Sequence, residues 1–181
     1  MKQRVTLHDK TFEKFITNDR IVESIETLAG RINEDYRDKP VPIFLGVLNG
    51  AFMFMGELMK HIDFNCEISF IKLASYVGTR SGGRITELIG LKDNIEGRHI
   101  IIVEDIVDTG ESIDHLMRSL TGHNPATMEV ATLLFKPAAY KKELPIKYTG
   151  LSIGNDFIVG YGLDYDQLGR NLGDIYVLAD E

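Results

Sequence analysis

Continuous aliphatic segments recur along the chain, and stretches with helical spacing of apolar residues separate them. Two of the aliphatic segments lie at 41–48 and 99–105, and the second contains four consecutive aliphatic residues. Strands that are apolar on both faces are typical of a parallel sheet that helices cover on both sides. Apolar residues recur every three to four positions in three candidate helices, at 17–38, 51–62 and 112–120. The sequence therefore predicts an α/β fold with a central parallel sheet flanked by helices.

The rest of the chain alternates strand-like segments with turns. We expect strands at 67–76, 85–91 and 128–135, a glycine-rich loop at 77–84, and short strands with turns at 148–179. Thr17, Asn18 or Asp19 is available to cap the first helix. A length of 181 residues suits one domain.

Composition excludes several classes of protein. A hydrophobic content of 44% and a charged content of 26% support a packed core rather than a disordered chain. The net charge of -7 argues against nucleic-acid binding, which depends on clustered Lys and Arg. No apolar run approaches the roughly 20 residues of a membrane helix, and the first residues lack the apolar core of a signal peptide. With Cys66 as the single cysteine, an internal disulfide is impossible, and we expect a cytoplasmic protein.

Carboxylates lie at the end of the aliphatic strand at 99–105 and continue toward the next helix. The strand end contains Glu104 and Asp105, and the turn after it contains Asp108, Thr109, Gly110 and Ser112. Ligands of parallel sheets bind at the carboxyl ends of the strands, and a helix start favours phosphate because free amides point outward there. Acids beside a phosphate repel it unless a cation intervenes, which suggests Mg²⁺; alternatively, the acids accept hydrogen bonds from ribose hydroxyls. The competing interpretation is a solvated turn with an ordinary helix cap.

Several motifs resemble those of one enzyme family. The segment VEDIVDTGES at 103–112 closely resembles the motif that binds phosphoribosyl diphosphate (PRPP) in type I phosphoribosyltransferases. LGVLNGAFMFMGELM is similar to the pyrophosphate loop of the hypoxanthine-guanine phosphoribosyltransferases, and SYVGTRSGGR occupies the place of their mobile catalytic loop. LLFKPAAY and DFIVGYGLDYDQLGRNL resemble their purine-recognition and carboxyl-terminal segments. The resemblance covers 41–178, and Lys136 with 157–170 indicates the branch that uses 6-oxopurines.

The resemblance implies roles for the residues of the turn. Glu104 and Asp105 are expected to hold the ribose hydroxyls, directly or through Mg²⁺. Asp108 is the expected catalytic residue, facing the five-membered ring of the purine and taking or hydrogen-bonding its ring-nitrogen proton. The 5'-phosphate of PRPP is expected to lie within Asp108, Thr109, Gly110, Glu111 and Ser112. Glu111 departs from the Lys or Asn of relatives, so it is expected to contribute its backbone amide.

The resemblance also implies a pyrophosphate loop at Leu48, Asn49 and Gly50, with Arg170 as a further contact. Relatives can contain a cis peptide in this loop. Many of them place Lys or Arg where this chain has Asn49, so pyrophosphate binding here is expected to depend more on amides and metal. The plain alternatives are a strand-to-helix turn for the loop and a surface ion pair of Asp164 with Arg170.

The purine is expected to bind between Lys136 and the carboxyl-terminal tail. Lys136 would donate to the exocyclic oxygen of a 6-oxopurine and reject adenine. Phe157 would stack on the base, and backbone groups of Ile158 or Val159 would complete its recognition. Asp164 would contribute to a second Mg²⁺ or, through its carbonyl, meet an exocyclic amine. The alternatives are a solvated lysine and an ordinary core phenylalanine.

Ser75 and Tyr76 begin the expected mobile loop, which would close over PRPP and exclude water. A surface hairpin is the alternative for this glycine-rich segment. The resemblance further implies a small hood, built from the amino-terminal segment and the tail at about 150–181, and a homodimer or homotetramer.

The expected function is a magnesium-dependent purine-salvage transferase. It would convert hypoxanthine, and guanine as well, to the nucleoside monophosphate with release of pyrophosphate. Two alternatives stay open. One is a transferase that prefers xanthine, and the other is a non-catalytic regulator that keeps the fold and binds nucleotide or RNA.

Overall fold

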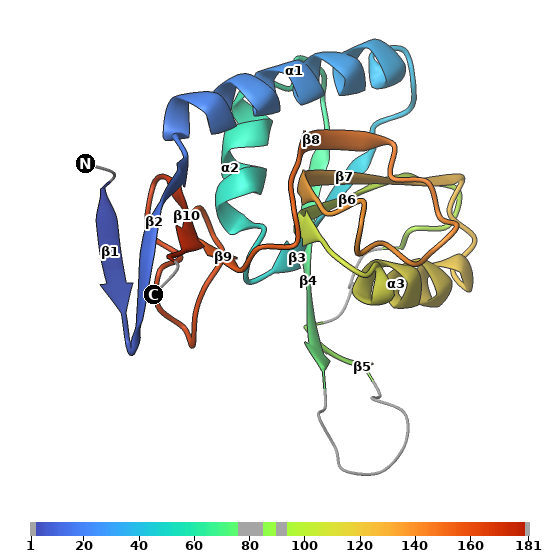
Figure 1. Ribbon diagram of the computed structural model, residues 1–181. Helices are drawn as coiled ribbons and strands as arrows, with labels where there is room; N and C mark the ends of the chain where they lie inside the picture. Colours follow the sequence, from blue (N-terminus) through green and yellow to red (C-terminus); the bar gives the residue numbers. More distant parts are fainter. Residues whose placement is uncertain (1–2, 76–84, 90–93, 180–181) are drawn as a thin grey trace.

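The structure, a computed structural model, describes residues 3–75, 85–89 and 94–179 (Figure 1). Its centre is a six-stranded sheet whose strands are, in spatial order, β5 (Ile85–Ile89), β4 (Glu67–Ser75), β3 (Ile43–Leu48), β6 (His99–Val107), β7 (Thr127–Phe135) and β8 (Tyr148–Ser152). The strands β4, β3, β6, β7 and β8 run parallel to one another, and β5 runs antiparallel to β4 at the edge of the sheet. The predicted parallel sheet is confirmed.

Three helices cover this sheet. α1 (Asn18–Tyr36) and α2 (Phe52–Lys60) lie on one face, and α3 (Glu111–Thr121) lies on the other (Figure 1). The side chains of β6 alternate between the two layers, because successive residues of a strand point to opposite faces. Ile101 and Val103 pack in the core with α1 and α2, whereas Ile100 and Ile102 pack in the core with α3. Burial of such a side chain contributes roughly 1.5–3 kcal/mol, so β6 anchors both layers.

The longest helix, α1, begins where the sequence predicts a cap. The hydroxyl of Thr17 accepts a hydrogen bond from the amide of Arg20 at 3.4 Å. One stripe of the helix is fully buried, and it contains Ile21, Ile25, Leu28 and Ile32. This stripe and the cap confirm the helix predicted at 17–38, and they place its carboxyl end beside β8.

A separate antiparallel sheet forms the hood. Its strands are, in spatial order, β1 (Arg4–Leu7), β2 (Lys10–Ile16), β10 (Ile175–Leu178) and β9 (Ile158–Val159). The amino-terminal strands therefore pair with strands of the tail. β8, which comes before β9 in the chain, pairs with β7 and buries Tyr148 in the large core. None of the helices in the described ranges is long and apolar enough to cross a bilayer.

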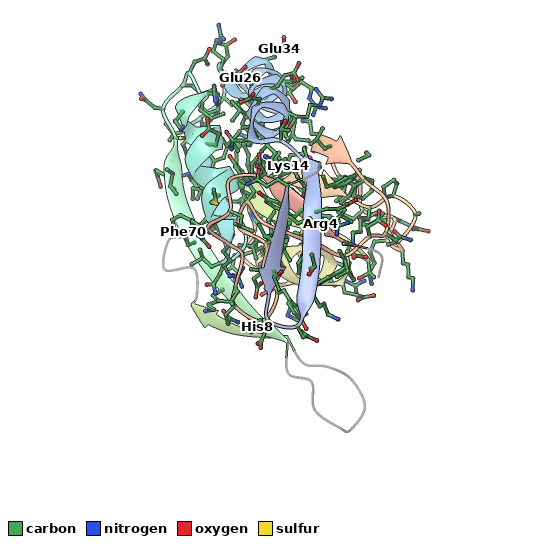
Figure 2. The ribbon with its side chains drawn as sticks, turned by 60° about the vertical axis from the view of Figure 1, so that its left-hand side comes forward. Arg4, His8, Lys14, Glu26, Glu34 and Phe70 are labelled. Atoms are coloured by element: carbon green, nitrogen blue, oxygen red, sulfur yellow. The ribbon has the colours of Figure 1, made fainter. Side chains whose placement is uncertain are left out.

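Asp174 connects the hood to the first helix. Its Oδ1 atom accepts a hydrogen bond from the amide of Asn18 at 2.8 Å, and its Oδ2 atom lies 2.5 Å from Nζ of Lys14. Figure 2 shows Lys14 on the hairpin of β1 and β2, close to the start of α1. The ion pair with Lys14 lowers the pKa of Asp174. The carboxylate therefore contributes stability as long as it stays ionised.

We predict that Asp174→Asn lowers the free energy of unfolding at pH 7 by about 1–2 kcal/mol, because it removes a charged hydrogen-bond partner of two elements. The pKa of Asp174 is depressed in the folded state, so its contribution is complete above the unfolded value of about 3.9 and disappears as the pH falls through the folded value. Urea unfolding at neutral and acid pH measures both effects. Asp38→Asn, at an exposed position, is the control, and an equal loss at both pH values would contradict the prediction.

Candidate active site

The carboxyl ends of three neighbouring parallel strands meet at one edge of the sheet. Val103 of β6 pairs with Gly46 of β3, and Val107 of β6 pairs with Phe135 of β7. The loop at 48–50, the turn at 108–110 and the residue after β7, Lys136, therefore lie along one edge. These are three of the segments for which the sequence predicts binding roles.

The turn after β6 forms an open pocket of about 310 Å³, lined by residues 104–113. Gly110 is its tightest point, with a φ of +84°, and a Cβ atom there would lie only 2.5 Å from the ring of Tyr140. Only glycine satisfies both the left-handed backbone and this contact. α3 begins at the next residue, so its first amides face the pocket without partners inside the helix. The turn has the geometry of a phosphate site.

Glu104 and Asp105 lie inside β6 rather than at its end. The strand continues to Val107, and the side chains of both acids are buried, with residue exposures of 7% and 8%. Burial and the adjacent Asp105 carboxylate raise the pKa of Glu104 well above its ordinary value. Burial also raises the pKa of Asp105, although the charge of Arg170 acts in the opposite direction. Two buried carboxylates this close favour a bound proton or a cation between them.

These two carboxylates fit a shared Mg²⁺ ion. Magnesium takes hard oxygen ligands and commonly uses one or two carboxylates together with waters and substrate phosphate oxygens. Among the residues that the structure describes, no group of three or more His, Cys, Asp and Glu side chains could hold a metal alone. The donor set therefore suits a metal that is completed by substrate, with Glu104 and Asp105 as the protein ligands.

The loop at 48–50 packs directly against Asp105. The peptide bond between Leu48 and Asn49 is cis. A cis peptide is the geometry that the resemblance suggests for this loop. A Cβ atom on Gly50 would lie 1.6 Å from Oδ2 of Asp105, so the carboxylate rests on the glycine backbone. The side chain of Asn49 is exposed. The arrangement brings the predicted pyrophosphate loop to the predicted ribose acids.

The tail also contacts this loop. Gly162 has a φ of +100°, and a Cβ atom there would lie 2.1 Å from the carbonyl oxygen of Gly50. Arg170 donates to the carbonyl of Gly162 at 2.8 Å and pairs with Asp164 at 2.7 Å. The other oxygen of Asp164 accepts the amide of Gln167 at 2.8 Å. Asp164 thus holds Arg170 in place in this structure, and a metal at Asp164 would have to displace these partners.

Asp108 and Lys136 form an ion pair across the ends of β6 and β7. Nζ of Lys136 lies 3.1 Å from Oδ2 of Asp108. The lysine side chain is 9% exposed, whereas the aspartate side chain is 48% exposed. The alternative of a solvated lysine is therefore wrong. A buried ammonium group is presented next to a carboxylate that remains accessible, which suits recognition of a polar planar ligand.

Phe157 lies at the edge of the hood with 44% of its surface exposed, so it is not an ordinary core residue. Its ring centroid is 6.0 Å from that of Phe12 and 5.8 Å from that of Tyr165. Tyr165 in turn donates from its hydroxyl to Asp9 at 2.7 Å. The next residues, Ile158 and Val159, form β9 and are buried. The ring packs beside two aromatic neighbours, and its exposed surface is available for stacking.

The remaining predicted site residues are Ser75 and Tyr76, and the structure adds three residues that the sequence did not indicate. Ser75 is the last residue of β4, and Tyr76 with the rest of the predicted mobile loop lies outside the described residues. The sequence reasoning did not find Tyr140 and Lys142, which contact Gly110, or Tyr165, which supports Phe157. The sequence shows only how many positions separate these residues from the binding motifs, and that number does not predict a contact in the folded chain.

Comparisons of this chain with known proteins all indicate the same family. The model of the phosphoribosyl transferase domain matches residues 13–166. A hypoxanthine-guanine phosphoribosyltransferase of Streptococcus pneumoniae is 41% identical over 167 residues, or 92% of each chain. A hypoxanthine-guanine-xanthine phosphoribosyltransferase of Tritrichomonas foetus is 42% identical over 163 residues, covering 90% of this chain and 88% of the relative.

A solved structure agrees with these relatives. The hypoxanthine-guanine phosphoribosyltransferase of Bacillus anthracis superposes with a TM-score of 0.86 at 33% identity, covering 92% of this chain and 98% of that chain. The fold and the matched length agree with those of these relatives. The chain belongs to the type I phosphoribosyltransferases, in their hypoxanthine-guanine branch.

Proposed function

We propose that the protein transfers the phosphoribosyl group of PRPP to hypoxanthine and guanine, forming the nucleoside monophosphates and pyrophosphate in purine salvage. One observation carries the proposal. The turn at 108–110, with the first amides of α3 and the buried acids Glu104 and Asp105 beside it, lies on the same edge of the sheet as Lys136. A sugar phosphate and a planar base can therefore be held side by side.

The sugar phosphate end of PRPP is assigned to the turn. Thr109, Gly110, Glu111 and Ser112 contribute backbone amides and hydroxyls to the 5'-phosphate. Glu104 and Asp105 hold the ribose hydroxyls, directly or through Mg²⁺. When bound, the metal supplies positive charge that offsets the pyrophosphate leaving group.

The pyrophosphate is assigned to the loop at Leu48, Asn49 and Gly50 and to Arg170. The carboxylate of Asp105 on the Gly50 backbone and the guanidinium of Arg170 near it support this placement. Asn49 carries no charge, so the amides of the loop and the metal have the larger share of the binding. Asp164 positions Arg170 through its 2.7 Å ion pair, and a role as ligand of a second Mg²⁺ remains part of the proposal.

The purine is assigned to the space between Lys136 and Phe157. The buried ammonium of Lys136 donates to the exocyclic oxygen of hypoxanthine or guanine, Phe157 stacks on the ring, and backbone groups of Ile158 or Val159 bind the opposite edge. Asp108 accepts the proton of the ring nitrogen, or hydrogen-bonds it, as the new bond to the anomeric carbon forms. Ser75 and Tyr76 begin the segment that would exclude water, the competing nucleophile.

A second candidate substrate is xanthine. The relative in Tritrichomonas foetus, 42% identical, is named for hypoxanthine, guanine and xanthine. A non-catalytic regulator that binds RNA is disfavoured by the net charge of -7. The expectation of a cytoplasmic enzyme stays a prediction.

The direct test measures nucleotide formation from PRPP with each of hypoxanthine, guanine, xanthine and adenine. The assay is run with Mg²⁺ and again with an excess of chelator. We expect turnover with hypoxanthine and guanine, none with adenine, and loss of turnover in the chelator. Absence of product from every base in the presence of Mg²⁺ would refute the proposal, and turnover with xanthine would widen the substrate range.

Asp108→Asn is expected to lower kcat by about 10²-fold or more while changing the KM for PRPP by only a few-fold, because the amide keeps the shape and cannot take the proton. Steady-state kinetics with PRPP and hypoxanthine measure both constants. Asp38→Asn, far along the chain and exposed, controls for general effects of removing a carboxylate. Equal kcat values for the Asp108 variant and the unchanged protein would remove Asp108 from catalysis.

Lys136→Met is expected to raise the KM for hypoxanthine and guanine by about 10–100-fold, because the ammonium donor to the exocyclic oxygen is lost while the aliphatic stem is kept. Discrimination against adenine should narrow in the same variant. Kinetics with the three bases measure this, with Lys141→Met as a matched control at an exposed neighbouring position. Unchanged KM values for both 6-oxopurines would place base recognition elsewhere.

We further propose that the protein forms a homodimer or homotetramer through the flank of α2 and the outer face of β4. Phe52, Ile68 and Phe70 are 46%, 50% and 38% exposed there. Figure 2 shows Phe70 at the surface beside α2, and a Cβ atom on Gly46 would touch both Phe70 and Met55. Phe70→Asp is expected to shift sedimentation toward the monomer, and an unchanged mass would exclude this surface.

A further inference from the structure

The segment that follows β7 crosses the start of α3. The amide of Lys141 donates to the carbonyl of Thr109 at 3.2 Å. A Cβ atom on Gly110 would lie 2.5 Å from the ring of Tyr140 and 2.9 Å from Cγ of Lys142. Figure 1 shows this connection between β7 and β8 running beside α3. The stem of Lys142 therefore lies against the glycine of the phosphate turn, although the residue is 32 positions away in the sequence.

The pocket at this turn is rich in negative charge. Its lining residues, 104–113, include four acids, Glu104, Asp105, Asp108 and Glu111, and no lysine or arginine. The helix amides attract a phosphate group that enters the pocket, and these carboxylates repel it. Lys136 already pairs with Asp108. A further cation is needed beside Glu111 if the first turn of α3 is to accept an anion.

Lys142 is placed to supply that charge. Its Nζ atom lies 2.8 Å from Oε1 of Glu111 and 3.4 Å from Oδ2 of Asp114, two acids on one face of the first turn of α3. The other oxygen of Asp114 is held by Arg118 at 3.1 Å. The lysine side chain is 21% exposed, whereas the Glu111 side chain is 65% exposed, so the ammonium group is partly shielded and the carboxylate faces solvent.

We propose that Lys142 is a positioning residue of the sugar-phosphate site, which rests on the function proposed above. Its ammonium holds the carboxylate of Glu111 against the outer side of α3, and its charge cancels that of Glu111 next to the phosphate turn. Without it, Glu111 carries an uncompensated negative charge one residue from Gly110. Lys142 thereby affects how tightly PRPP binds and has no part in the chemical step.

An ordinary surface ion pair is the competing explanation. Such pairs contribute little to stability and nothing to substrate affinity. The two explanations differ in the KM for PRPP and in the effect of removing Glu111. If Lys142 only stabilises the fold, removal of Glu111 cannot repair a change in KM.

The test compares Lys142→Met, Lys142→Arg, Glu111→Gln and the double variant Glu111→Gln with Lys142→Met. Lys141→Met is the matched control, because it removes one charge from the same segment at an exposed position. Steady-state kinetics with hypoxanthine at saturation and PRPP varied give kcat and KM separately. Titration calorimetry with PRPP and Mg²⁺ gives the affinity directly, and thermal unfolding shows that each variant is folded.

We expect Lys142→Met to raise the KM for PRPP by about five- to tenfold with kcat changed by less than about twofold. Lys142→Arg should stay near the unchanged protein, and the double variant should recover most of the lost affinity because the charge of Glu111 is then absent. These results together would support the proposal.

Two outcomes would overturn it. A KM for PRPP in Lys142→Met that equals that of Lys141→Met would show that the charge of Lys142 does not reach the phosphate. A raised KM that the double variant fails to recover would show that Glu111 is not the group that Lys142 offsets. Absence of turnover in the unchanged protein is a separate result, because it would refute the proposed function itself.

Discussion

The contact between Asp105 and the backbone of Gly50 is the constraint on which the arrangement of the site depends. The carboxylate of Asp105 in β6 rests directly on a loop glycine, and Gly162 of the tail approaches the carbonyl of the same glycine. The loop and the tail approach each other backbone to backbone, and only the short Asp105 side chain lies between the loop and β6. The close approach of these segments therefore depends on glycine at both positions. The hood is fixed to the large sheet through this contact.

The electrostatics of the site follow from where charges are buried. Glu104 and Asp105 are withdrawn from solvent inside β6, which raises their pKa values and favours a cation beside them. The cationic groups nearby are each held by an acid: Lys136 by Asp108 and Arg170 by Asp164. An acidic protein can therefore bind an anionic substrate, because helix amides, paired cations and a shared metal provide the positive potential locally.

The main elements of the fold could be predicted because each is encoded locally. Aliphatic runs become β3, β6 and β7, and the stripe of α1 follows helical spacing. The sequence predictions are incomplete where the structure depends on pairing between strands that are far apart in the sequence. The run after Val103 continues as strand to Val107 because β7 pairs alongside it. The hairpin of β1 and β2 carries no strong strand signal in the sequence, and it pairs with β10 from the far end of the chain.

By itself, the sequence determined the parallel sheet, the covering helices and the turn at 108–112, because hydrophobic periodicity and a glycine with few permitted neighbours are properties of short segments. Only the tertiary structure decided that Lys136 is buried against Asp108, that Phe157 is exposed, and that Lys142 lies against Gly110. These facts depend on which loops meet at the edge of the sheet. Such meetings are set by packing between distant segments, and no local pattern of residue types records them.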